Sequence, residues 1–242
     1  MKKAVIIIAI VVAVAAICTV LILKGWPGVL IGSGNLETEQ YAFANFTRVE
    51  ISSAFEFEIK QSGSYSVNVT ADDNVIDYVQ VSQDGQTLKI RLVTVPSLRL
   101  VTLRALVTIP QLRGLAVSGA SGGSVSEFSS TEGLNITVSG ASRVTGDITA
   151  GNAEFEVSGA STVRLEGSAD NMTARVSGAS LFSLDDFTVN NAQANISGAS
   201  TGTINLDGRL DANVSGASTL LYIGDPVMGT MNVSGASSLG KK

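Results

Sequence analysis

Apolar and polar residues alternate along most of this chain. In segments such as 134–138 and 155–157, every second residue is apolar and the residues between are polar. A period of two is typical of β-strands that bury one face and expose the other. The pattern therefore predicts an all-β domain made of short strands of roughly four to six residues.

The alternation is interrupted seven times by the tetrapeptide Ser-Gly-Ala-Ser, each time after one β-branched aliphatic residue. The copies begin at Ser118, Ser139, Ser158, Ser177, Ser197, Ser215 and Ser234, which are 18 to 21 residues apart. A near-constant period indicates a repeat architecture in which each unit stacks on the next. Parallel stacking at ~4.8 Å brings identical residues into columns, and parallel crossovers favour the right hand. The repeat predicts a right-handed parallel β-helix, or β-solenoid.

Each tetrapeptide is expected to form a corner of the solenoid. The aliphatic residue and the Ala are three positions apart, as in Val157 and Ala160. Residues on one side of a straight strand are an even number apart, so both side chains face inward only if the chain bends between them. Gly159 tolerates the positive φ that such a bend needs. We expect Ala on the inner side, and serine ladders in which hydroxyl groups satisfy one another.

The residue before each aliphatic position predicts an outward-facing column. Glu156 and Arg175 fall on neighbouring rungs of this column, as an exposed pair of opposite charge worth roughly a few tenths of a kcal/mol. Three asparagines follow on later rungs, and we expect their amides to form a ladder. The column consists of Ala116, Thr137, Glu156, Arg175, Asn195, Asn213 and Asn232.

Residues 41–242 are expected to form a single β-helix domain, with irregular rungs over 41–115 and the seven repeats over 116–242. In the irregular part, the dipeptide Asp84-Gly85 separates two alternating segments and predicts a β-hairpin. The segment 72–78 (DDNVIDY) predicts a short helix, because Asp residues suit the first turn of a helix.

The start of the chain combines two lysines with a long apolar run. Residues 4–23 carry no charge, and 20 residues at ~1.5 Å each span the ~30 Å hydrocarbon core of a bilayer. More positive charge precedes the run than follows it. We predict that residues 1–24 are an uncleaved transmembrane anchor, with the bulk of the chain outside the cytoplasm.

Two other roles of this N-terminal segment remain open. A cleaved signal peptide is the main alternative, since a small-x-small pattern lies within the run. Lipid attachment at Cys18 is disfavoured because Ile17 precedes it in place of a small residue. Residues 25–40, which contain four glycines, are expected to be a flexible tether.

The composition removes several functional classes. Hydrophobic residues make up 45% of the chain, which has one Cys and no His. It therefore forms no internal disulfide and lacks the usual general base and the commonest metal ligand. Beyond residue 34, 13 Lys and Arg stand against 21 Asp and Glu, a net charge of −8. This balance disfavours nucleic acid or an anionic lipid surface as a partner.

The order of the motifs resembles a known family. An opening strand phrase over 46–59 is followed by a turn and strand over 61–70, the phrase DDNVIDYV, a hairpin, and the sequence IPQL leading into the first Val-Ser-Gly-Ala-Ser. This order, over about residues 43–240, resembles the auto-transporter adhesin head domain, or GIN domain, of exported prokaryotic proteins. The resemblance implies a right-handed parallel β-helix at the cell surface or in the envelope, and it brings no catalytic residues.

Seven Asn-x-Ser/Thr sequons are present. Asn195, Asn213 and Asn232 share one column, where glycans would collide and an amide ladder is the better interpretation. If the host glycosylates exported proteins, the remaining sequons are the candidate acceptors. These are Asn45, Asn68, Asn135 and Asn171.

The sequence offers no catalytic, cofactor-binding or metal-binding residues. The repeated serines have no His to activate them, and the one SxxK match, Ser238 to Lys241, falls in a segment expected to be a frayed tail. The acidic pairs Asp72-Asp73 and Asp185-Asp186 lack the alternating oxygen ligands of a Ca²⁺ loop and are expected in turns or on solvated faces.

The functional prediction is a membrane-anchored, extracytoplasmic, non-catalytic β-helix. Its repetitive Ser, Thr and Asn surface is expected to bind surface glycans or other envelope proteins. One alternative is a structural envelope module that associates with itself through an exposed end, where Lys241 and Lys242 would act as charged gatekeepers. A less favoured alternative is an enzyme acting on polysaccharide.

Overall fold

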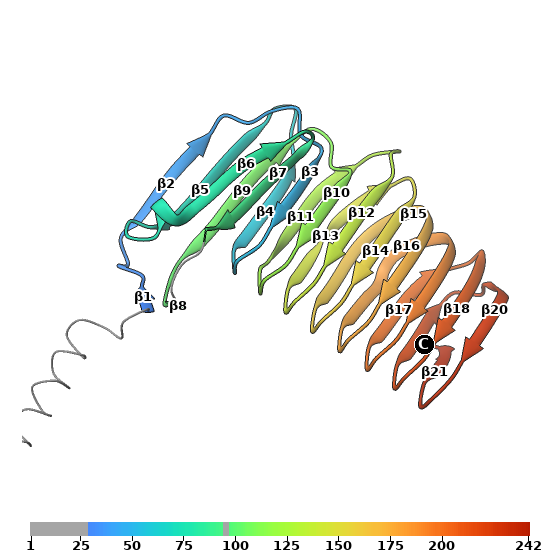
Figure 1. Ribbon diagram of the computed structural model, residues 1–242. Coiled ribbons are helices and arrows are strands. Elements are labelled where there is room, and N and C mark those ends of the chain that lie inside the picture. Colours follow the sequence, from blue (N-terminus) through green and yellow to red (C-terminus); the bar gives the residue numbers. More distant parts are fainter. Residues whose placement is uncertain (1–28, 94–96) are drawn as a thin grey trace, which may run out of the picture.

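The computed structural model describes residues 29–93 and 97–242. Within these residues, 19 strands join into one long sheet that winds as a β-solenoid, and two further strands form a small separate sheet (Figure 1). Parallel pairs connect corresponding strands of successive rungs through the repeat region, as in β12–β14 and β17–β19. The all-β solenoid predicted from the alternation and the period is confirmed.

The strands fall into two stacks that enclose the core. Stack I contains, in spatial order, β2 (Leu36–Tyr41), β5 (Ser66–Asp72), β9 (Leu103–Ile109), β4 (Glu56–Gln61), β11 (Gly122–Ser129), β13 (Arg143–Ala150), the first half of β15 (Thr162–Val176), the first half of β16 (Leu181–Ile196), β17 (Thr201–Leu206), β19 (Thr219–Ile223) and β21 (Ser238–Lys241). Stack II contains β6 (Val79–Asp84), β7 (Thr87–Leu92), β3 (Arg48–Ile51), β10 (Gly114–Val117), β12 (Leu134–Val138), β14 (Ala153–Val157), the second halves of β15 and β16, β18 (Arg209–Val214) and β20 (Val227–Val233).

A continuous apolar core runs along the solenoid between the stacks. In β12, Leu134, Ile136 and Val138 are buried, and the polar residues between them are not. Aromatic rings fill the middle rungs: Phe155 is fully buried and meets Phe182 with ring centroids 5.2 Å apart. Because each rung up to β18 buries the same positions as its neighbours, the alternation seen in the sequence becomes one continuous core, whereas apolar residues of the last rung, such as Val233, are exposed.

The glycine of every tetrapeptide forms the predicted corner. All seven corner glycines have φ between 64° and 82°, the left-handed region that glycine enters without a Cβ penalty. The next residue hydrogen-bonds to the preceding rung, as where the Ala160 amide donates to the Gly140 carbonyl at 2.7 Å. A Cβ on Gly159 would lie 2.3 Å from that same carbonyl oxygen. The left-handed conformation therefore favours glycine, and the close stacking at Gly159 requires it.

The prediction that Ala lies on the inner side of the corner is wrong. Ala160 is exposed, whereas Ser161, the last residue of the tetrapeptide, is 1% exposed. The bend includes all three residues Ser-Gly-Ala, none of which is buried. The next inward-facing residue is therefore the final Ser, one position later than a bend at glycine alone would give. The same inward serine recurs at Ser121, Ser142, Ser180, Ser200 and Ser218.

The buried serines bond to backbone groups, and not to one another as the sequence suggested. The Ser180 hydroxyl donates to the Ser177 carbonyl at 2.9 Å within its own corner. It also accepts the Ser161 amide of the preceding rung at 3.4 Å. The hydroxyls of Ser161, Ser180, Ser200 and Ser218 thus satisfy corner backbone groups that would otherwise be buried without a partner, whereas the Ser142 hydroxyl is buried without a hydrogen bond.

An eighth corner precedes the seven perfect copies. The β3–β4 connection has the sequence Ile-Ser-Ser-Ala-Phe, and Ile51 pairs with Val117 of the first perfect copy. Ser53 stands where the others have glycine and adopts φ 75°, and Phe55 takes the place of the inward serine. This corner does not stand out in the sequence, because it lacks the intact tetrapeptide and keeps only the looser pattern of an aliphatic residue, Ser, any residue and Ala.

Antiparallel strands close the N-terminal end of the solenoid. β2 pairs with β5, and β6 pairs with β7 in the hairpin predicted at Asp84-Gly85. The expected helix over 72–78 is only the 3₁₀ turn η1 (Ile76–Tyr78), because Asp72 completes β5. Short strands with charged outer faces are a common way to protect the edge of a sheet.

The segment after residue 28 is attached to the domain, and this differs from the expected tether over 25–40. β1 (Val29–Ile31) pairs in parallel with β8 (Ser97–Arg99), and β2 follows directly. The carboxylate of Asp72, 1% exposed, accepts the amides of Gly34 at 2.7 Å and Thr102 at 2.6 Å. These contacts hold the segment in place. The predicted transmembrane anchor lies outside the described residues, and within 29–93 and 97–242 no helix is long and apolar enough to cross a bilayer.

Replacing Asp72 by Ala is expected to loosen this attachment, because the Gly34 and Thr102 amides lose their acceptor. Hydrogen exchange at Gly34 and Thr102 should become about tenfold faster. Amide donors, Thr102 first, lower the pKa of Asp72, so the attachment is complete above the usual carboxyl pKa and weakens as the pH falls through the lowered value. Asp77→Ala, at an exposed neighbour, is the control. Equal exchange in both variants would contradict this role for Asp72.

Candidate binding surface

The outward side chains of stack II form columns of polar residues along the solenoid. The first column is the predicted one, which occupies the position directly before each aliphatic residue. A second column lies two residues before the first along the sequence, and a third lies two residues before the second. The second contains Asn135, Glu154, Thr173, Gln193 and Asp211, and the third contains Asn152, Asn171, Asn191 and Arg209. We call this three-column surface the amide groove.

Two ladders of side-chain amides run along the groove. The predicted ladder is confirmed: Asn213 Nδ2 donates to Asn195 Oδ1 at 2.9 Å, and Asn232 Nδ2 donates to Asn213 Oδ1 at 2.6 Å. A second ladder joins Asn152, Asn171 and Asn191, with both N···O distances 2.9 Å. An amide has two donor hydrogens and two acceptor lone pairs, so each ladder residue keeps hydrogen-bonding capacity for a ligand.

The second ladder does not follow from the tetrapeptide itself. Its members recur at 19 and 20 residues, the same period as the tetrapeptide. The ladder thus leaves a periodic signal in the sequence, at positions that lie six residues before the tetrapeptide and not next to it. Asn171, expected to be a less constrained sequon, is therefore held between two other asparagines.

Charged residues in the groove are neutralised by neighbours. Arg175 lies 2.8 Å from Glu154 and 3.8 Å from Glu156, the partner predicted from the register. Arg209 bonds both carboxylate oxygens of Asp211, at 2.8 and 3.0 Å. The Arg209 guanidinium, with the Thr230 amide, lowers the pKa of Asp211 to about 2. The groove thus combines fixed ion pairs with neutral amides.

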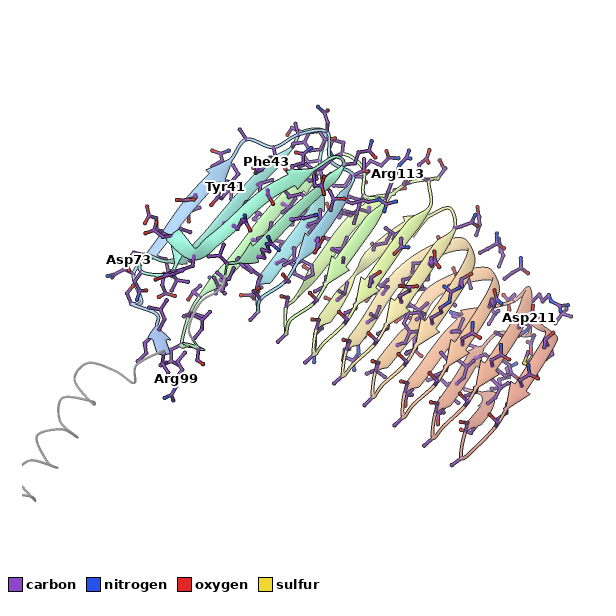
Figure 2. All side chains as sticks on the ribbon, in the orientation of Figure 1. Tyr41, Phe43, Asp73, Arg99, Arg113 and Asp211 are labelled. Carbon is purple, nitrogen blue, oxygen red and sulfur yellow. The ribbon has the colours of Figure 1, made fainter. Side chains whose placement is uncertain are left out.

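The groove is a shallow, continuous depression. Two adjoining hollows of about 790 Å³ and 500 Å³ share Asn171, Thr173 and Gln193. Arg113 lines the first hollow and Asp211 the second, and Figure 2 shows them far apart along the solenoid. The surface therefore has the shape of a track for an extended ligand, and not of a pocket for a small molecule.

Stack I carries a separate hollow of about 780 Å³ near the N-terminal end. It arises where Gly122 on β11 leaves a gap between the outward side chains of the two flanking strands, Glu56 on β4 and Arg143 on β13. Its lining changes from strand to strand. The repeated chemistry that distinguishes this chain lies on stack II, so we place the candidate surface there.

The family model described as "Putative auto-transporter adhesin, head GIN domain" matches residues 45–226. The chain belongs to this family. The resemblance seen in the order of motifs is thus confirmed. No curated protein matches the chain.

Solved structures share this GIN-domain fold. A protein of Bacteroides fragilis titled "putative adhesin" has a TM-score of 0.80 and 20% identity, covering 88% of this chain and 100% of that one. One from Parabacteroides merdae with the same description has a TM-score of 0.74 and 17% identity, covering 89% and 99%. A "putative lipid binding protein" of Parabacteroides distasonis has a TM-score of 0.68 and 20% identity, covering 88% and 99%. At these identities the likeness concerns the fold.

The other candidate acceptor sequons occupy different settings in the GIN domain. Asn45 is exposed in a turn with φ 61°. Asn68 is half-buried on β5 and donates to the Ser66 hydroxyl at 3.0 Å, and Asn135 is half-buried on β12. Asn45 is thus the most accessible of these sequons, and its glycosylation stays a prediction.

The acidic pairs and the C-terminal residues have structural roles. Asp72 and Asp73 hold the segment before β2, and Asp185 accepts hydrogen bonds from Ser183 and Lys242. The expected frayed tail is instead strand β21, paired in parallel with β19. Lys241 pairs with Asp225, so both terminal lysines are engaged. Among the residues that the structure describes, no His, Cys, Asp and Glu cluster has the three members that a metal site needs.

Proposed function

We propose that this GIN domain is a non-catalytic binding module of the cell surface or envelope, and that its amide groove binds extended glycan chains. The observation that carries the proposal is the pair of asparagine ladders, each of which repeats the same donors and acceptors over three successive rungs, about 4.8 Å apart. A polysaccharide likewise repeats hydroxyl groups along its length. The adhesin descriptions of the family and of its solved members agree with this function.

The ion pairs favour binding over polysaccharide cleavage. Glycoside hydrolysis needs one carboxyl group that stays protonated near neutral pH and a second that is ionised. Asp211 is held ionised by Arg209, and Glu154 lies against Arg175. The groove carboxylates are therefore arranged as fixed partners of arginine, and not as proton donors.

Residues 4–23 complete the proposal as a membrane anchor. The run is uncharged and as long as a bilayer-spanning helix, and the positive residues before it favour an extracytoplasmic domain. The groove would then face the space outside the cytoplasmic membrane.

The glycan proposal is tested with residues 29–242, which contain every described strand and the whole core. The protein is applied to an array of bacterial and host oligosaccharides, and its hits are compared for Asn191→Ala/Asn213→Ala and for the control Thr162→Ala/Thr201→Ala on stack I. The groove variant should bind about tenfold more weakly, since each lost amide removes hydrogen bonds to the ligand. The control should bind normally.

Three results would contradict the proposal that the amide groove binds glycans. Absence of binding above a bare surface would count against glycans, and equal binding by both variants would place the site elsewhere. Sedimentation of the same samples shows whether the protein is monomeric; concentration-dependent self-association without glycan binding would instead favour a structural module.

A further inference from the structure

A small apolar tip lies at the end of the domain that follows the apolar segment. β1 and β8 pair with each other and with no strand of the main sheet, and Figure 1 shows them side by side at one end of the domain. Leu30 and Leu98 pack against the core. Alternation along the strands then turns their neighbours Ile31 and Arg99 outward, and these two are directly paired in register.

The tip exposes large apolar side chains in a fixed position. Leu100 is 87% exposed, more than any other large apolar residue among those described, and Ile31 is 48% exposed. The Gly32 amide donates to the Arg99 carbonyl at 3.1 Å, and a Cβ on Gly32 would meet the Leu100 carbonyl oxygen at 2.5 Å. The two strand ends are thus in direct contact.

The buried carboxylate of Asp72 holds the backbone next to the tip in place. Asp72 accepts the Gly34 and Thr102 amides, which lie just beyond Ile31 and Leu100 along the two strands. Asn74 Nδ2 also donates to the Ile31 carbonyl at 2.8 Å. Leu100 adopts φ 52°, a left-handed conformation that is strained for leucine and persists only where surrounding contacts hold the backbone.

The short distance along the chain between the apolar run and β1 indicates which surface the tip contacts. Only residues 24–28 separate the apolar run from Val29, and five extended residues reach at most about 17 Å. The headgroup layer on each side of the hydrocarbon core is itself about 5 to 8 Å thick. If the run spans a bilayer, the tip therefore lies in or beside the headgroups.

The charge of the tip suits a phospholipid headgroup. Arg99 takes no part in the ion pairs found among the described residues, and Figure 2 shows it at the end of the tip, with Asp73 farther back. A guanidinium binds phosphate through two parallel hydrogen bonds. The net negative domain disfavours a strongly anionic surface, so a zwitterionic lipid is the better partner.

We propose that Ile31 and Leu100 insert into the interfacial layer of the membrane and that Arg99 binds a lipid phosphate. The domain would then stand on the bilayer in a fixed orientation, and would not swing on a tether. This inference rests on the proposed membrane anchor.

The full chain in phosphatidylcholine vesicles tests this proposal. A single fluorescent label is placed on Leu100→Cys or Ile31→Cys in a Cys18→Ser background, and vesicles carry lipids with a quencher near the headgroup. Strong quenching at both positions is expected. The control is Ala236→Cys, an exposed corner position at the far end of the solenoid, which should not be quenched.

The native Cys18 separates the two parts of the proposal. A label on Cys18 should be quenched by lipids that carry the quencher deep in the acyl chains, which reports the anchor alone. Quenching at Cys18 without quenching at residues 31 and 100 would overturn the tip and leave the anchor. Quenching at residues 31 and 100 without Cys18 would support the tip and overturn the anchor, and no quenching at any position would overturn both.

Discussion

Replacing Gly159 by Ala is expected to destabilise the domain by about 3 kcal/mol or more. The added Cβ would lie 2.3 Å from the Gly140 carbonyl oxygen, and Ala would have to adopt φ +78°. The clash is with backbone of the neighbouring rung, so no side-chain rotation relieves it. That carbonyl also accepts the Ala160 amide, and the hydrogen bond between the two rungs should weaken with it.

Thermal unfolding followed by circular dichroism measures this effect, with Gly133→Ala as the matched control. A Cβ at Gly133 meets nothing closer than the Asn152 carbonyl oxygen at 3.6 Å, an ordinary contact. Gly133→Ala should leave the Tm within a few degrees of the parent, and the restricted unfolded chain can even raise it. A similar Tm for the two variants would show that the corner does not need glycine.

Replacing Phe155 by Ala should destabilise the domain by about 3 to 5 kcal/mol. Phe155 is fully buried, and its ring makes edge contacts with Phe182 at 5.2 Å and Phe187 at 6.2 Å. The lost ring leaves a cavity that the stacked rungs cannot close, because their spacing is fixed by hydrogen bonds between backbones. The expected fall in Tm is roughly 10 °C.

The control for Phe155 is the next residue on the same strand. Glu156 points outward and lies 3.8 Å from Arg175, an exposed contact of little energetic weight. Glu156→Ala should therefore change the Tm by no more than a few degrees. Comparable losses in both variants would mean that the inward and outward positions of β14 are misassigned.

The sequence predicted those parts of the fold that depend on periodicity. The strand alternation, the stacked rungs, the corner glycines and the Asn195 to Asn232 ladder all follow from residues recurring every 18 to 21 positions. The position of Ala160 did not follow. The even spacing of inward residues within a strand does not determine how many residues a bend contains. The bend at this corner contains three.

Features without a repeat were harder to predict. The attachment of the segment from Val29 depends on Asp72, a single carboxylate whose partners are 38 and 30 residues away along the chain. The composition of that segment, rich in glycine, suggested a flexible tether, but tertiary hydrogen bonds overrode the local preference. The tip around Leu100 was missed for the same reason, since nothing in the sequence states that β1 and β8 pair.

The candidate binding surface could be predicted only in part. The sequence identified the column that ends in Asn232 and the Glu156–Arg175 neighbours. It missed the ladder through Asn152, Asn171 and Asn191, whose alignment requires the register of β14, β15 and β16. Ion pairs such as Arg209–Asp211, two residues apart on one strand, depend on rotamers that periodicity does not specify.

The solenoid is closed by antiparallel strands at one end and continues as uniform rungs beyond them. Its length can therefore change by whole repeats. β2 pairs with β5 and β6 pairs with β7, both near the N-terminal end, so inserting or deleting one repeat farther along leaves that closure unchanged. Each inserted repeat would lengthen the groove by about 4.8 Å and carry its far end the same distance from the tip. Gene duplication within the repeats could thus adjust how far the protein reaches, and how many ligand units it holds, without a new fold.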